Sequence, residues 1–442
     1  MVTTLYQSVI RKGICTGCGA CIALSSTSSA QMVDSPRGPL PEFGNTSEPE
    51  AGLRVCPANR LSYPHLYRSH YGHLPDRWLL GEVVATRTGY STDPEIRRRS
   101  ASGGILTTTL IYLLEQRRVD AVVAVRQGVP TPERARAVIC STRAEILACA
   151  QSVYVPVSLL DILREFEPGK RYAMTCLPDQ AAALRALQRE GFEPARQVHY
   201  VLGPYTGTAL DPGAIPAYLR SKGVNEKDPV TSLQWRAGEW PGYLEIRTAS
   251  GKVLQTKKVY YNYLIPFFIT RNSLQNMDFA NEFSDLAVGD AWAPGFEAAG
   301  GGHAVFTTRT PSMEAIVMDM IKQGLLFADP VDPLKASEMH GHMLDFKKRG
   351  GYIRNQLRRR IGLAAPDFGM RPRPLPWSRI GVELIISLIF AICGSGAARW
   401  LLARIPESIL GPFFNRLRLG WKRLSKPTKR KGLGELTMEE TW

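Results

Sequence analysis

Four cysteines near the start of the chain have the spacing of an iron–sulfur site. Cys15, Cys18 and Cys21 form a C-x2-C-x2-C run, and Cys56 stands directly before Pro57. Three thiolates at this spacing can wrap one face of an iron–sulfur cube, and a remote fourth thiolate closes the site. Because the chain holds one such run, we expect a single 4Fe–4S cluster with these four ligands.

Two other interpretations of the cysteines are a structural zinc site and unligated thiols. Zinc usually takes two C-x2-C pairs rather than a three-cysteine run. Gly17 and Gly19, which lie between the cysteines, would let backbone N–H groups approach the sulfur atoms. The pattern therefore favours the cluster over zinc.

The elements that must position these cysteines change character along the chain. Residues 1–60 are rich in Cys, Gly and Ser with little hydrophobic periodicity, which is typical of a small loop-dominated module. The next part alternates apolar strands with helices, which favours an α/β fold with a largely parallel sheet. We expect helices over 105–115, 144–150, 158–166, 180–190 and 313–324, strands over 119–125, 171–176, 198–203, 285–292 and 303–310, and a hairpin over 244–261.

The composition is that of a folded chain with unevenly placed charge. Hydrophobic residues make up 44% and charged residues 21% of 442 positions, which excludes global disorder. Eight cysteines are too few for a disulfide-stapled secreted scaffold, and the first residues hold no apolar run typical of a Sec signal peptide, so we expect a cytoplasmic protein. Residues 341–442 carry 20 Lys and Arg against 7 Asp and Glu, or +13 of the net +15. We therefore expect the basic, partner-binding surface in this last segment.

Several segments, in order, resemble one family. They are RRRSASGGILTTTLIYLLE (97–115), QSVYVPVSLLDIL (151–163), TCLPDQAAALRAL (175–187), QWRAGEWPGYLEI (234–246), MDFANEFSDLAVGDAW (277–292) and GGHAVFTTRT (301–310). Together with the cysteine module they resemble the coenzyme F420 hydrogenase/dehydrogenase beta-subunit family, over about three quarters of the chain. The resemblance implies an oxidoreductase in which a 4Fe–4S cluster exchanges electrons with FAD, with ferredoxin or a deazaflavin coenzyme as redox partner.

The same resemblance points to a flavin-binding segment. Ser100, Ser102, Gly103 and Gly104 precede a predicted helix, where free N–H groups and the helix dipole favour an anionic group. Without the resemblance, an ordinary helix cap would be the better interpretation of this segment. Tyr154 lies in the part that resembles the family's flavin-pocket loop. We assign these five residues to flavin binding and assign no catalytic residue.

The chain departs from the family at a second cysteine set that many relatives carry. One thiol of that set, Cys176, is present. The other positions hold Asp179, Tyr205, Ser273 and Asn276. These side chains cannot form an all-thiolate cube. We therefore expect the second cluster to be absent.

Four acidic residues close to one another could be mistaken for catalytic carboxylates. We expect them instead to serve as caps, loop acceptors and ion-pair partners of Arg271 or Arg309. The four are Asp278, Glu282, Asp285 and Asp290.

The last segment mixes apolar, aromatic and cationic residues. The apolar run within 380–405 is interrupted by Glu383, by Gly394–Gly396 and by Arg399, and 407–424 is amphipathic. A spanning helix needs about 20 mostly apolar residues. A helical hairpin lying on an anionic membrane fits best, with docking on a partner subunit and a true span as alternatives. Nucleic-acid binding is not expected, because phosphate contacts would leave the neighbouring aliphatic run exposed to water.

We thus expect an α+β or α/β protein with four parts. They are a ferredoxin-like 4Fe–4S module (1–75), an α/β flavin domain with a mixed sheet (76–215), a β-rich C-terminal domain of the same family (216–345) and a basic, membrane-associated helical tail (346–442). The expected protein is a flavin-dependent oxidoreductase, peripheral on the cytoplasmic membrane face. The alternative is a non-enzymatic electron-transfer or anchoring subunit of a membrane-bound redox complex.

Overall fold

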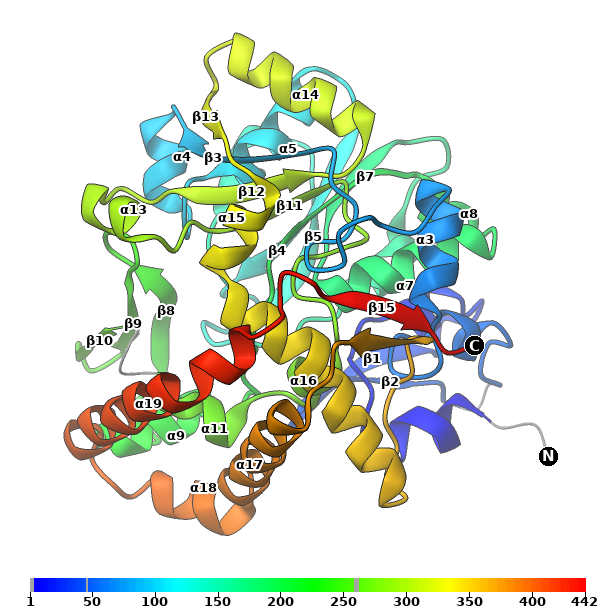
Figure 1. The fold of residues 1–442 in the computed structure, drawn as a ribbon. Coiled ribbons are helices and arrows are strands. Elements are labelled where there is room, and N and C mark those ends of the chain that lie inside the picture. The colour runs from blue at the N-terminus through cyan, green and yellow to red at the C-terminus, as the bar shows by residue number, and fades with distance from the viewer. Residues whose placement is uncertain (1–3, 45–46, 258–261) are drawn as a thin grey trace.

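A mixed eight-stranded sheet forms the centre of the protein (Figure 1). The structure is a computed structural model that describes residues 4–44, 47–257 and 262–442. In spatial order the strands are β13 (Leu326–Pro330), β3 (Ala85–Ser91), β12 (Ala304–Thr308), β11 (Leu286–Asp290), β7 (Val198–Pro204), β6 (Tyr172–Thr175), β4 (Ala121–Gln127) and β5 (Ala135–Cys140). β4, β6, β7 and β11 run parallel, with antiparallel strands on both sides. The expected mixed α/β architecture is confirmed.

Helices connect and cover these strands. Those of the body are α4 (Pro94–Arg99), α5 (Ile105–Glu115), α6 (Arg143–Ala148), the 3-10 helix η2 (Leu160–Glu165), α7 (Pro178–Arg189), α8 (Glu193–Arg196), α9 (Ala214–Ser221), the 3-10 helix η3 (Asn262–Leu264), α11 (Ile265–Phe268), α12 (Arg271–Gln275), α13 (Pro294–Ala299), α14 (Pro311–Lys322), α15 (Pro333–Met339) and α16 (Gly341–Arg360). The predicted helices over 105–115, 180–190 and 313–324 are confirmed within two residues at each end.

Side chains of the central strands alternate between two apolar layers. Tyr172 and Met174 of β6 join the layer that contains α7, whereas Ala173 joins the layer that contains α5 and α14. Because both layers are buried, the parallel strands consist of nearly continuous apolar runs. This explains why the sequence could predict them.

A second, smaller sheet is made of β8 (Val230–Ala237), β9 (Tyr243–Thr248) and β10 (Val253–Lys257), in the order β10–β9–β8. The predicted hairpin is confirmed as β9 and β10, and its last residues, 258–261, lie outside the described part of the chain. β11 and β12, in contrast, belong to the large sheet. The expected domains 76–215 and 216–345 therefore share one sheet.

The N-terminal module packs beside this body and holds short elements. They are the π-helix η1 (Tyr6–Ile10), α1 (Ala20–Ala23), the hairpin of β1 (Gln31–Ser35) and β2 (Gly38–Glu42), α2 (Gly52–Val55) and α3 (Tyr63–Tyr71). Its own apolar cluster is small and centred on Leu5, Val9, Ile14 and Ile22. The ferredoxin-like fold of this module stays a prediction.

Helix α16 carries charged side chains into the interior, so part of the expected basic surface is wrong. Five of the basic residues in 341–442 are buried: Lys347, Lys348, Arg349, Arg354 and Arg379. Lys348 pairs with the buried Glu282, and Lys347 donates a 2.7 Å hydrogen bond to the Ser273 carbonyl. Since α16 packs inside the body, the expected tail boundary at 346 falls within a core helix.

A continuous ionic network joins α16 to the next helix. Asp345 accepts from Arg349 at 2.6 Å and from Arg379 at 2.8 Å. Arg379 reaches Glu383 at 2.7 Å, and Glu383 also pairs with Arg354. All five side chains are nearly inaccessible to solvent, so each charge depends on its neighbours for compensation.

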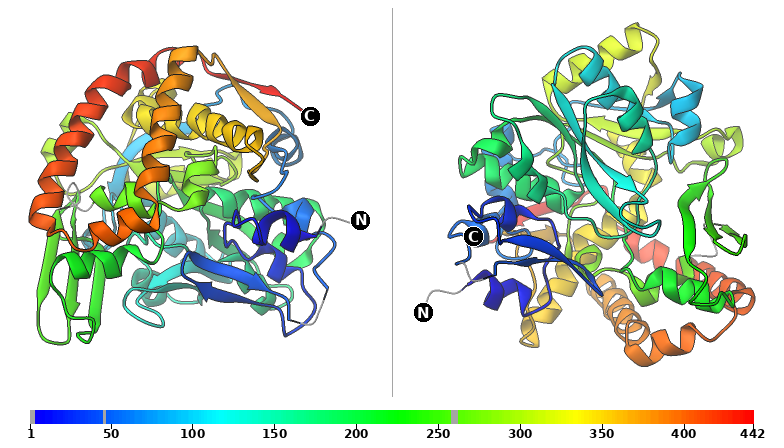
Figure 2. Two further views of the ribbon diagram at one scale, coloured as in Figure 1. Left: turned by 90° about the horizontal axis from the view of Figure 1, so that it is seen from below. Right: turned by 180° about the vertical axis from the view of Figure 1, so that it is seen from behind.

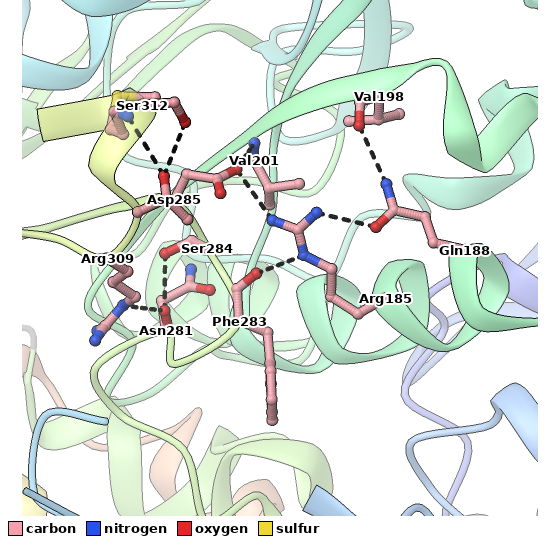
Figure 3. Close-up of polar contacts among 12 residues, drawn as sticks. Arg185, Gln188, Val198, Val201, Asn281, Phe283, Ser284, Asp285, Arg309 and Ser312 are labelled. Carbon is pink, nitrogen blue, oxygen red and sulfur yellow. Dashed lines mark hydrogen bonds and ion pairs between the residues drawn. The ribbon is translucent and has the colours of Figure 1, made fainter. Parts of the chain in front are cut away.

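The four carboxylates between 278 and 290 contact other protein groups, and their ion-pair partners are Lys348, Arg185 and Arg236 rather than those expected. Glu282 contacts Lys348 and the Tyr67 hydroxyl, and its N–H donates to Asp278. Asp285 binds Arg185, which also donates to the Phe283 carbonyl, both at 3.0 Å (Figure 3).

The predicted ion pairs with Arg271 and Arg309 are wrong. Arg309 donates to backbone carbonyls, including those of Ala280 and Asn281, and Arg271 donates to the Gly13 carbonyl at 2.6 Å. Both arginines therefore fix loops rather than neutralise carboxylates.

The final helices form the outside of the molecule, at the end opposite to α4 and α14 (Figures 1 and 2). They are α17 (Trp377–Cys393), α18 (Gly396–Leu402) and α19 (Glu407–Arg430). The strands before and after them, β14 (Met370–Arg373) and β15 (Thr437–Glu440), pair antiparallel. In the described residues no single helix is long and apolar enough to cross a membrane. α17 and α18 satisfy the length and composition criteria only as a pair, bent by 69°.

The ionic network predicts a large stability effect at one position. Glu383→Gln removes the carboxylate between two buried arginines and should lower the free energy of unfolding by about 3 kcal/mol. Urea unfolding measures it. Glu440→Gln, which breaks the exposed pair with Arg68, is the control and should change stability little. If the two substitutions lowered the free energy of unfolding equally, the ionic network would not have the stabilising role that we assign to it.

A second prediction concerns pH. Burial, and then the Glu282 carboxylate, raise the pKa of Asp278 from 3.8 to about 7. The folded protein therefore holds a proton that the unfolded chain releases, and the free energy of unfolding should fall as pH rises between about 4 and 7. Asp278→Asn should flatten this dependence, as measured by urea unfolding across that range. An unchanged slope in the variant would show that another group is responsible.

Candidate cluster pocket and ligand cleft

The four predicted cluster cysteines line one small pocket. Cys15 and Cys18 lie on the loop before α1, Cys21 lies within α1, and Cys56 directly follows α2. The remaining wall is largely apolar and includes Leu5, Val9, Ile10 and Met32. The fold thus brings together four thiols that are up to 41 positions apart in sequence, and of these Cys18 is buried while the other three are half-buried.

Two glycines shape the cysteine loop. Gly17 and Gly19 have φ angles of 73° and 87°, in the left-handed region. A Cβ atom at Gly17 would lie 2.8 Å from the Pro39 carbonyl oxygen, and one at Gly19 would lie 2.7 Å from the Asp161 nitrogen. The Gly17 N–H donates to Cys15 Sγ at 3.4 Å.

Burial determines the protonation of these thiols. It raises the pKa of Cys15 to about 11 and that of Cys18 to about 12. The pKa values of Cys21 and Cys56 are also well above the usual value, first through burial and then through repulsion by the neighbouring cysteines. Thiolates would therefore form here only with a cationic group, whose binding would release protons.

The four cysteines share one pocket but do not form a preformed site for a single metal ion. Four thiolates at 2.3 Å from a zinc ion would need sulfur atoms about 3.8 Å apart. Among the residues that the structure describes, no three Cys, His, Asp or Glu side chains are arranged to hold a metal ion.

The cysteine loop is attached to the carboxyl edge of the large sheet. Burial raises the pKa of Asp179, at the start of α7 just after β6, and the nearby side chains of Asn272 and of Thr16 in this loop oppose that rise. The Leu160 N–H donates to the Cys18 carbonyl at 2.8 Å. Ligand sites in open α/β sheets lie at this edge.

The positions of the second cysteine set hold side chains engaged in protein contacts. The Ser273 hydroxyl accepts from the Ala209 N–H at 2.8 Å, and the Asn276 side chain accepts from the Asp278 N–H at 2.7 Å. Tyr205 bonds Thr307 at 2.9 Å. The absence of a second cluster stays a prediction.

A cleft of about 300 Å³ lies between the end of β4, the loop after α6 and strand β8. Gln127 and Gln151 line it, and their amide nitrogens donate to the Pro132 and Arg99 carbonyls at 2.6 and 3.1 Å. Their Oε1 atoms are buried and have no hydrogen-bond partner among the described residues. Both glutamines therefore line the cleft with their acceptor atoms turned away from solvent.

The five residues assigned to flavin binding fall into two groups. Gly103 and Gly104 pack against protein, since a Cβ at these positions would lie 2.6 Å from the Gly89 carbonyl oxygen and 3.0 Å from an Ile96 carbon. The Ser102 hydroxyl donates to the His303 carbonyl at 2.8 Å.

Ser100 and Tyr154 lie nearer to the cleft. Ser100 follows Arg99, which Gln151 contacts, and its buried hydroxyl has no partner among the described residues. The Tyr154 ring meets the ring of Trp235, a cleft residue, edge-on at 5.5 Å. Sequence reasoning missed Gln127 and Gln151, because single glutamines form no pattern.

Comparisons with known proteins place the chain in a family. Residues 86–164 match the N-terminal domain described as coenzyme F420 hydrogenase/dehydrogenase, beta subunit, and residues 169–333 match its C-terminal domain. No curated protein matches the sequence. A chain from a structure of the F420-reducing nickel–iron hydrogenase complex of Methanosarcina barkeri is similar in fold, with 18% identity and a TM-score of 0.50 over 63% of this chain and 94% of that one. The chain belongs to the coenzyme F420 hydrogenase/dehydrogenase beta-subunit family of oxidoreductases.

Proposed function

We propose that this protein is an iron–sulfur flavoprotein oxidoreductase that passes electrons between a 4Fe–4S cluster and FAD. The observation that carries the proposal is the single, largely apolar pocket lined by all four cysteines and attached to the carboxyl edge of the sheet. Family membership supports a redox role. Ferredoxin or a deazaflavin coenzyme is the proposed redox partner.

The pocket residues would hold the cluster and control its surroundings. Cys15, Cys18, Cys21 and Cys56 would bind it as thiolates, and the apolar wall would exclude water. The Gly17 N–H would stabilise negative charge on sulfur through its hydrogen bond. A bound 4Fe–4S cluster supplies one-electron transfer.

The cleft would receive the flavin ring. The side chains of Gln127 and Gln151 would turn so that their unpartnered Oε1 atoms accept N–H groups of the ligand, and Trp235 would supply an apolar wall. β4, which ends at the cleft, is hydrogen-bonded to β6, which ends beside the cysteine loop. Bound FAD supplies exchange between one-electron and two-electron chemistry.

The alternative is a non-enzymatic electron-transfer or anchoring subunit of a membrane-bound redox complex. The packing of Gly103 and Gly104 against protein favours it, because these glycines then serve the fold rather than a cofactor. Flavin content separates the two functions, since only the enzyme retains a reducible flavin.

The cluster proposal predicts a cysteine-specific loss of iron. Anaerobically purified protein should show a broad sulfide-to-iron absorption that dithionite bleaches, and Cys18→Ser should remove most of it. Iron and sulfide analysis measures the change. Cys393→Ser, on α17, is the control and should retain the cluster. Bound zinc without iron would overturn the proposal.

The cleft proposal predicts a weaker flavin complex when an acceptor is lost. Gln151→Leu leaves a ligand N–H unpaired and should raise the FAD dissociation constant about tenfold. Fluorescence titration of the apoprotein with FAD measures it. Gln323→Leu, at the exposed end of α14, is the control. Equal affinity of both variants and the parent would exclude this cleft as the flavin site.

A further inference from the structure

Helix α17 has its polar side inward and its apolar side outward. Arg379 and Glu383 are fully buried in the ionic network with α16. The opposite side is aliphatic, and its side chains are 40% to 60% exposed: Leu384, Ile385, Leu388, Ile389 and Ile392. In a water-soluble protein an amphipathic helix normally shows the reverse arrangement.

The next two helices continue this apolar surface. α18 exposes Trp400 and Leu401, and α19 exposes Ile409, Phe413, Leu417 and Leu424. α19 is held on the body from its other side, where Leu410 and Phe414 pack into the core next to the small sheet. We call these exposed residues of α17, α18 and α19 the α17–α19 surface. α17 packs against both α18 and α19, and exposed apolar side chains gathered on neighbouring helices mark an interaction site.

Cations surround the apolar residues on the α17–α19 surface. Exposed ones after α18 are Arg404, Arg416, Arg423, Lys426, Arg430 and Lys431. Of the acidic side chains described in this part of the chain, Glu383 is buried, and Glu435 is exposed beyond the end of α19. The surface therefore needs a partner that is apolar over a wide area and negatively charged at its boundary.

We propose that the α17–α19 surface binds an anionic lipid bilayer and lies within its interfacial layer. The apolar side chains would enter the boundary of the acyl chains while the arginines and lysines reach phosphate groups. Trp377 and Trp400, 87% and 59% exposed, suit the headgroup level.

The geometry limits the depth of this contact. α17 is 17 residues long, or about 25 Å, which is shorter than the bilayer core of about 30 Å. The chain then bends by 69° into α18. The ionic network also fixes the inner side of α17 to the body. The surface therefore lies on the bilayer rather than across it, and this inference does not depend on the redox proposal.

Vesicle flotation of the full-length protein tests the proposal. The protein should float with vesicles of phosphatidylcholine mixed with phosphatidylglycerol and much less with phosphatidylcholine alone. Salt should weaken this binding only in part, because apolar burial persists when charges are screened.

Substitutions on the exposed face sharpen the test. Leu388→Glu combined with Ile392→Glu should lower the vesicle partition coefficient about tenfold or more. Leu334→Glu is the control, because Leu334 on α15 is 48% exposed and lies outside the surface. Arg423→Glu should also weaken binding, whereas Arg98→Glu on α4 should not. Thermal unfolding verifies that the variants remain folded.

Three results would overturn the proposal. One is the absence of binding to either vesicle by folded protein. The second is equal binding by the α17 variant and the Leu334 control. The third is a dimer in sedimentation analysis that the α17 substitutions dissociate, which would make a second copy of the chain the occupant of this surface.

Discussion

Helix α16 carries its charges into the interior, and an unpaired buried charge costs several kcal/mol. The positions of the neighbouring segments follow from that constraint. The buried charge of Asp345 is compensated by Arg379, and that of Arg379 by Glu383. α17, which carries Arg379 and Glu383, must therefore turn its polar side inward. Lys348 requires Glu282, which places the segment before β11 beneath the same helix. The outward apolar side of α17 is thus a consequence of how α16 is neutralised.

The same segment before β11 links the ionic network to the two candidate sites. Arg185 of α7 binds Asp285, while Asp179 at the start of α7 contacts the cysteine loop. β4 and β6 are adjacent parallel strands, so the edge that holds the cysteine pocket also leads to the cleft. Parallel strands place chemically different loops side by side at one edge, and this allows one sheet to position two sites.

Sequence reasoning succeeded where one physical requirement dominates a local stretch. The parallel strands are buried on both faces, so their apolar runs are visible, and the cysteine spacing reflects ligand geometry. It failed for α16, because Lys347, Lys348 and Arg349 look like a solvated basic face unless their distant partners are known. β3 and β5 were missed because arginines and threonines interrupt their apolar pattern. The sequence gives no indication of a role for Gln127 and Gln151, since that role depends on which of their side-chain atoms have no hydrogen-bond partner after folding.

The pairing of β14 with β15 shows how the last part of the chain is connected to the body. The chain returns to the body after α19, where Glu440 pairs with Arg68 of α3 and the Thr441 N–H donates to the Gly369 carbonyl. Residues 374–436 are therefore an insertion within a β-hairpin rather than a free tail. These helices are attached to the body in two ways, through the base of that hairpin and through the ionic network with α16. Truncation after β14 would remove both the helices and the strand that closes the hairpin. Excision of residues 374–436 would keep both strands but would leave Asp345 and Arg354 without Arg379 and Glu383.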